Sequence, residues 1–130
     1  MNKIHFMFAL FLLFPISLSA QIAYPMQIKT DDNTNKEIKT FYMQVQEMFA
    51  QDSRFDLGHH QSGTFVVWLA AKKEKNYIMY SVTMTIFSPE LGIHIYVCSN
   101  VGFQDADVSS EGVKSIIEYI HQSIIRFQSQ

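Results

Sequence analysis

Cys98 and His94 are the residues whose types suggest chemistry most directly, because an imidazole can activate a thiol as a nucleophile. They stand four residues apart in a segment whose alternating pattern predicts a β-strand, and on a regular strand both point to the same face. A strand rises ~3.3 Å per residue, so their backbones would lie ~13 Å apart, whereas a dyad needs heavy-atom contact of about 3 Å. The spacing excludes a direct dyad on such a strand. A catalytic thiol would need a histidine from elsewhere in the chain: His59, His60 or His121.

His59 and His60 lie between Gly58 and Gly63, and no Cys or carboxylate cluster accompanies them as a structural zinc site would require. Asp105 and Asp107 look like paired carboxylates, but a polar loop before a helix explains them, since negative charge is favourable at a helix start. The chain has no glycine-rich phosphate loop, no Gly-x-Ser-x-Gly and no His-Glu-x-x-His motif. The sequence predicts no catalytic residue, no metal and no cofactor.

Residues 1–20 have the pattern of a secretory signal peptide. Lys3 is followed by an apolar run from Ile4 to Ile16 and by small residues that end at Ala20. An uncleaved membrane anchor is the alternative, but the run is short against the ~20 apolar residues that a spanning helix needs. We therefore expect an exported protein, periplasmic or extracellular, with no membrane span after the leader is removed.

The charge and the cysteine usage limit the classes of partner. Without Lys3, nine of the ten basic residues remain against twelve acidic ones, and Lys72, Lys73 and Lys75 cluster with Glu74 among them. This is not a basic patch, so nucleic acid is not expected as a partner. Cys98 is the only cysteine, so no disulfide forms within the chain and the domain must rely on packing.

Two alternating segments, 77–87 and 93–103, predict strands joined by a turn at Pro89 and Gly92. In the first strand Ile78, Val82 and their even-numbered neighbours share the apolar face. In the second strand one face is expected to carry four residues: Ile93, Ile95, Val97 and Val101.

The remaining elements complete an α+β domain over residues 34–130. A helix should begin at Thr34, and another at Ser109 or Ser110. Residues 64–71 are apolar almost throughout, which favours a central strand, and 54–57 predict a short edge strand. Residues 21–33 are expected to be an irregular arm. The order α-β-β-β-β-α predicts a two-layer sandwich, with both amphipathic helices on one face of an antiparallel sheet of three to four strands. The helices' apolar stripes are Ile38, Phe41, Val45, Met48 and Phe49, and Val113, Ile116, Ile117, Ile120 and Ile124.

The second face of this sheet is the candidate binding surface, because it alternates aromatic residues and Met with Ser and Thr. An uncovered sheet face is normally polar, so apolar side chains there suggest either a covering loop or arm, or a docking surface. The residues expected on it are Trp68, Met79, Phe87 and Tyr96, joined by Val66 and, at the margin, Tyr77.

The order of helix, Asp52-Ser53-Arg54-Phe55-Asp56-Leu57, the strand Gly63-Thr64-Phe65-Val66-Val67-Trp68 and a long hairpin resembles a periplasmic α/β module. That module includes the amino-terminal domain of the TolB translocation protein and related envelope assembly proteins. The resemblance covers roughly Thr34 to Gly102 and carries no functional residue across. It implies a binding or scaffolding role in the envelope.

Three functions remain open at this stage. The first is a non-enzymatic binding or adaptor domain that uses the aromatic sheet face or an edge strand, with another envelope or secreted protein or a second copy as partner. The second is a structural subunit whose hairpin strands extend a neighbour's sheet. The third is a small enzyme that uses Cys98 with His59, His60 and His94.

Overall fold

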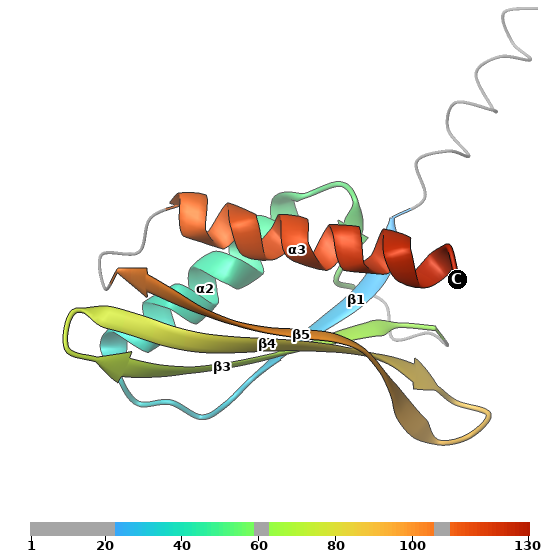
Figure 1. Ribbon diagram of the computed structural model, residues 1–130, viewed down its shortest axis with the longest axis horizontal. Helices are drawn as coiled ribbons and strands as arrows, with labels where there is room; N and C mark the ends of the chain where they lie inside the picture. The colour runs from blue at the N-terminus through green and yellow to red at the C-terminus, as the bar shows by residue number, and fades with distance from the viewer. Residues whose placement is uncertain (1–22, 59–62, 106–109) are drawn as a thin grey trace, which may run out of the picture.

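The structure, a computed structural model, describes residues 23–58, 63–105 and 110–130. The described elements form a five-stranded sheet with both helices packed on one side of it (Figure 1), which confirms an α+β fold. In chain order they are β1 (Tyr24–Thr30), α2 (Lys36–Gln51), β2 (Phe55–Asp56), β3 (Phe65–Glu74), β4 (Tyr77–Ser88), β5 (Ile93–Asp105) and α3 (Ser110–Gln128).

The sheet order is β2-β1-β3-β4-β5, and the sheet is mixed, not antiparallel as expected. β1 runs parallel to both β2 and β3, while β3, β4 and β5 are antiparallel neighbours. The expectation of an irregular arm at 21–33 is wrong for Tyr24–Thr30, which is strand β1. Pro25 does not prevent the strand, because the ladder with β3 begins one residue later, at Met26, so the missing N–H removes no bond to β3.

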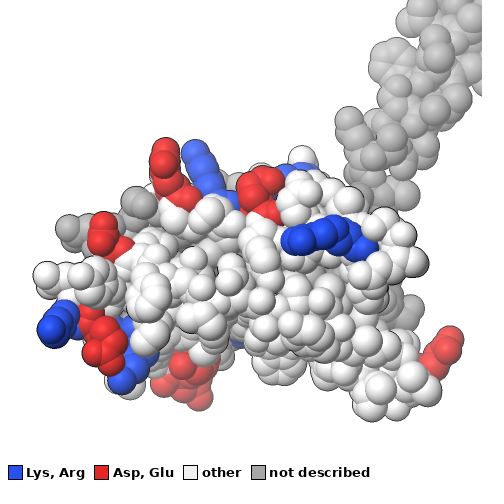
Figure 2. Space-filling view, viewed as in Figure 1, with Lys and Arg blue, Asp and Glu red and all other residues white. Residues whose placement is uncertain are grey.

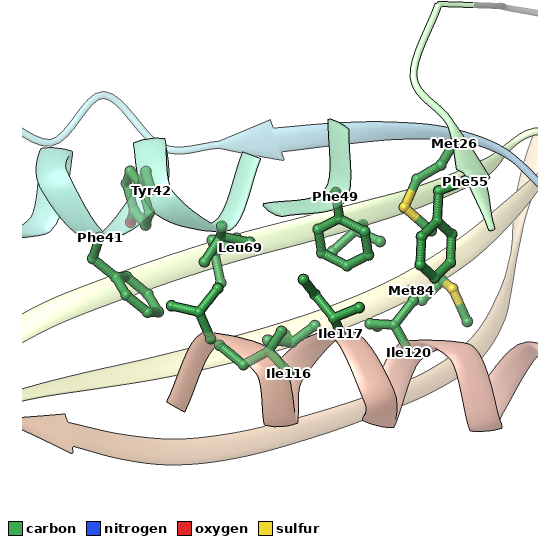
Figure 3. Close-up of a cluster of buried hydrophobic side chains, with 14 of the residues drawn as sticks. Met26, Phe41, Tyr42, Phe49, Phe55, Leu69, Met84, Ile116, Ile117 and Ile120 are labelled. Atoms are coloured by element: carbon green, nitrogen blue, oxygen red, sulfur yellow. The ribbon is translucent and has the colours of Figure 1, made fainter. Parts of the chain in front are cut away.

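The core lies between the sheet and the two helices, where side chains of α2 and α3 meet those of the strands (Figure 3). The predicted stripes are buried, except that Met48 is partly exposed and Tyr42 is buried beside Phe41. β3 is the central strand, as its apolar composition predicted. Full burial of one large apolar side chain stabilises by roughly 1.5–3 kcal/mol, so packing on this side can support the fold without a disulfide.

The first helix begins one residue later than the capping-box pattern predicted. Asn35 is its N-cap, and its side-chain oxygen accepts from the backbone N–H of Glu37 (2.9 Å) and of Ile38 (3.2 Å). Thr34 and Asn35 both suit a cap, and the sequence alone favoured Thr34 because of its spacing to Glu37.

A β-bulge in β5 changes which of its residues face the helices. Met84 pairs with Cys98 and Thr85 pairs with Tyr96, so Val97 is an extra residue without a β4 partner. Beyond the bulge the alternation is reversed. Val101 therefore lies on the face opposite to Ile93 and Ile95, and the predicted shared face was wrong.

The predicted leader, residues 1–20, lies outside the described residues. Among those that are described, α2 and α3 included, no helix combines the length and the hydropathy needed to cross a membrane.

Candidate interaction surface

The face of the sheet that points away from α2 and α3, here called the open face, carries all four predicted surface residues. Trp68 pairs with Thr83, Phe87 with His94, Met79 with Phe103 and Tyr96 with Thr85, and all of these pairs lie on that face. Tyr96 is 63% exposed and Trp68 is 38% exposed, whereas Met79 and Phe87 are half-buried. The structure thus brings the predicted residues onto one surface; what that surface binds stays a prediction.

An aromatic cluster surrounds Trp68 near the middle of the open face. Its indole N–H donates to Oγ1 of Thr85 (3.0 Å), and Thr85 Oγ1 lies 3.2 Å from Nδ1 of His94. Because the Thr85 oxygen accepts from Trp68, its own hydroxyl hydrogen is available for the His94 nitrogen. The His94 ring packs against Trp68 (centroids 5.6 Å apart) and Phe87 (5.1 Å), while Lys29 Nζ lies 4.8 Å from the Trp68 ring centre. These contacts hold Trp68 in one orientation.

Phe103 and Val101 extend the open face, and sequence reasoning missed them. Phe103 is 69% exposed, and Val101 and Tyr77 are also exposed. The β-bulge hid this group, because a strict two-residue alternation assigned Val101 to the core side. Val66 differs in the other direction: it lies on the open face but is only 2% exposed, so it adds nothing accessible.

The structure does not bring Cys98 and His94 together. Cys98 pairs with Met84 on the helix side, whereas His94 pairs with Phe87 on the open face. The bulge therefore places them on opposite faces, and the expectation that they share a face was wrong. Cys98 is half-buried and packs against the core. His59, His60 and Asp107 lie outside the described residues.

His121 belongs to a polar network on the helix side. Arg54 contacts Asp52 (2.7 Å), Glu118 (2.7 Å) and Nδ1 of His121 (3.2 Å). The hydrogen bond from Arg54 lowers the pKa of Asp52 and that of Glu118 below their usual values. Both carboxylates form ion pairs with the guanidinium, so the network links the start of β2 to α3 and we interpret its role as structural.

The outer edge of β5 is partly occupied by side chains of the same molecule. Tyr119 donates its hydroxyl to the carbonyl of Ser99 (2.8 Å), and Asn100 Oδ1 accepts from the N–H of Val101 (2.9 Å). Burial raises the pKa of Tyr119, so its hydroxyl remains a donor well above neutral pH. The middle of this edge therefore has fewer free groups for an added strand. Figure 2 nevertheless shows a broad uncharged area in the middle of the view, over β5, with the charges around its margins and over α3.

Two hollows lie on the opposite flank, between β1 and α2. One, of about 380 Å³, is lined by Gln27, Ile28, Gln46, Glu47, Ala50 and Leu57. The other, of about 440 Å³, is lined by Thr30–Thr34, Lys39, Tyr42, Met43 and Gln46. Gln46 contributes to both, so they follow one another along α2. Sequence reasoning missed this flank, because it did not recognise β1 as a strand.

No protein-family model, curated protein or solved structure matches the chain significantly. Among residues 23–58, 63–105 and 110–130, no three His, Cys, Asp or Glu side chains are grouped so as to hold a metal ion.

Proposed function

We propose that this protein is an exported, non-enzymatic adaptor that binds a partner protein through the open face of its sheet. The observation that carries the proposal is the apolar character of this face. Trp68, Tyr96 and Phe103 are exposed on the side of the sheet that neither helix covers. An uncovered antiparallel face normally carries polar residues, so large aromatic groups there need a reason.

The size of the apolar area supports a protein partner. A large aromatic side chain presents ~150–250 Å² when fully exposed, so the exposed aromatic residues and Val101 together offer roughly 500 Å². This is at the upper end of the apolar patches found on monomers. With the neighbouring Ser and Thr residues included, the face approaches the ~800 Å² per partner of a standard interface.

The composition of the face also fits an interface. Aromatic residues and Met are enriched at the centres of interfaces, and charged residues are depleted there. On the open face Lys72, Glu74 and Asp105 lie toward the margins, and Lys29 packs over the Trp68 ring. The ordered Trp68 cluster is the natural anchor, because a side chain already held by neighbours loses little entropy on binding.

Site-specific photocrosslinking of the full chain in the cells that produce it tests this proposal. A photoreactive residue in place of Phe103 should give a discrete adduct with another protein, and the same residue in place of Arg126 on α3 serves as the matched control. Adding Trp68→Ala should reduce the Phe103 adduct while the far-ultraviolet circular dichroism of the purified variant stays unchanged.

Three results would overturn the adaptor role. The first is the absence of an adduct from position 103. The second is an equal yield from position 126. The third is an adduct that contains two copies of this chain, which would make the open face a self-interface. Unfolding of Trp68→Ala would place Trp68 in the core and remove the anchor from the argument.

A further inference from the structure

The outer edge of β1 is an unfinished strand edge. Tyr24 donates its N–H to the carbonyl of Arg54 (2.8 Å), on the β2 side. Every second residue of a strand presents its N–H and C=O to the same side, so Ile28 and Thr30 also face this way. β2 pairs only with Tyr24 and Pro25, and within the described residues no strand lies against Ile28 and Thr30. The N–H and C=O groups of Ile28 and Thr30 are therefore open to an added strand, and we call them the acceptor edge because they would receive that strand.

The two hollows lie directly beside this acceptor edge. Ile28 lines the smaller one with Ala50 and Leu57, and Thr30 lines the larger one with Asp31 and Asp32. A strand added here would meet free backbone groups along β1. Beside them it would meet first the hollow that contains Ile28, Ala50 and Leu57, and then the polar hollow that contains Asp31, Asp32 and Lys39. This combination is the requirement for recognition by strand addition: main-chain bonds give affinity, and side-chain pockets give specificity.

The same molecule presents a strand segment that lacks a neighbour, in the first half of β5. The hairpin of β4 and β5 curves away from the helix layer (Figure 1), and Ile93 on its helix side is 50% exposed. Phe87 donates its N–H to Thr64 (3.1 Å), away from β5, so its partner His94 also directs its backbone groups away, toward the outer edge. Tyr96, two residues on, does the same. We call His94 and Tyr96 the donor edge, because they would supply the added strand. They are separate from the Ser99 carbonyl and the Val101 N–H, which are already hydrogen-bonded.

We infer that the donor edge of one copy pairs with the acceptor edge of a second copy. In an antiparallel arrangement Ile28 stands opposite Tyr96, and Thr30 stands opposite His94. Each edge offers two outward-facing residues, so the ladder contains four backbone hydrogen bonds. Residues 93–104 contain no Asp, Glu, Lys or Arg, so the pairing brings no like-charged side chains together along β5.

The side chains fit this register. Opposite residues of an antiparallel pair share a face, so the Tyr96 side chain of one copy lies beside Ile28 on the helix side of the second copy, next to the smaller hollow. His94 stands opposite Thr30, and its ring remains packed against Trp68 and Phe87 of its own copy. Because donor and acceptor are different surfaces, each copy uses both, and the assembly grows head to tail into a ring or a filament.

Sedimentation velocity on the purified protein, expressed as the full chain, tests the pairing. The wild type should associate as its concentration approaches the millimolar range. Tyr96→Pro removes one donor-edge N–H, and proline is tolerated on an edge strand where the N–H faces solvent. Ala50→Trp fills the smaller hollow, and Gln122→Trp on the exposed side of α3 is its matched control. Each of the first two variants should weaken association at least tenfold, whereas Gln122→Trp should not.

Mixing the two variants gives the sharpest outcome. Tyr96→Pro keeps its acceptor edge and Ala50→Trp keeps its donor edge, so the mixture should form a one-to-one dimer that neither variant forms alone. A monomeric wild type, association unaffected by Ala50→Trp, or a mixture that stays monomeric would each overturn the inference. If Tyr96→Pro is unfolded by circular dichroism, Tyr96→Asp replaces it, because it sets a carboxylate beside Glu47 in the same hollow. Tyr96 also belongs to the open face, so Ala50→Trp, which lies on α2 away from that face, is the variant that tests the pairing without altering the surface of the adaptor proposal.

Discussion

The two faces of the sheet are built from the same strands but follow different rules. Along β4, Ile78, Val82 and Met84 are fully buried under the helices, while Thr83 and Thr85, on the opposite face, are only half-buried. The helix side is closed by aliphatic and aromatic packing. The open face keeps large aromatic groups at its surface, held by Thr and His. The comparison indicates that stability resides on one face, and that the apolar residues of the other are available for contacts outside the molecule.

Phe41 and Phe103 give the largest expected contrast between the two faces. Phe41 is fully buried, so Phe41→Ala should lower the free energy of unfolding by about 3–5 kcal/mol, because it leaves a cavity. Phe103 is 69% exposed, so Phe103→Ala should change it by less than about 0.5 kcal/mol. Urea denaturation of both variants measures the difference. A large loss for Phe103→Ala would mean that the open face is covered in solution and that the comparison fails.

The helix-covered face was the part of the molecule that the sequence predicted best. Both apolar stripes recur at helical spacing, and β4 alternates without interruption, so their inward residues follow from periodicity. β1 could not be found in the same way, because it is short, contains Pro25, and gains its regular form from pairing with β2 and β3.

The candidate surface was predicted in part, for a similar reason. The two-residue alternation is unbroken in β3, in β4 and in the part of β5 before the bulge. The face was therefore predicted correctly for Trp68, Met79, Phe87 and Tyr96. Val101 and Phe103 follow the bulge, which adds one residue and reverses the face of every later side chain. A bulge has no strong residue signature of its own, and here it depends on pairing with Met84.

Gly102 gives a second contrast, within β5 itself. It lies opposite Tyr80 on the helix side, and a Cβ placed on it would clash with the Tyr80 hydroxyl and ring. The Tyr80 ring packs against Phe41 (centroids 5.4 Å apart), so it cannot move freely aside. Gly102→Ala should therefore lower the free energy of unfolding by about 1–3 kcal/mol, because the added methyl group overpacks this site.

The neighbouring substitution Val101→Ala, on the open face, is the control for Gly102→Ala. The Val101 side chain is exposed, so Val101→Ala should change the free energy of unfolding by no more than about 0.5 kcal/mol. Thermal unfolding of both variants under the same conditions compares them. Equal losses would show that both faces of β5 are packed, and would remove the distinction that the bulge creates.

The smallest expected difference concerns ion pairs on the two sides. Arg54, on the helix side, pairs with Asp52 and Glu118, and all three side chains are at least one-fifth exposed. Arg54→Ala should therefore lower the free energy of unfolding at neutral pH by no more than about 1 kcal/mol. Lys72→Ala, which removes the exposed pair with Glu74 at the margin of the open face, is the control and should cause no measurable change.

The stability difference between wild type and Arg54→Ala should depend on pH in a defined direction. Arg54 lowers the pKa of Asp52 in the folded state below its usual value of 3.8. The stabilisation is therefore present above pH 3.8 and is lost as the pH falls through the lower folded-state pKa, where both states become protonated. Urea denaturation at neutral and acidic pH should show the gap between wild type and Arg54→Ala narrowing in acid. A gap that stays constant would mean that Arg54 stabilises through its packing over Phe55, where the guanidinium carbon lies 5.7 Å from the ring centre. In that case apolar packing would stabilise the margin of the helix side as well as its core, and the two faces would differ more strongly in how much they contribute to stability.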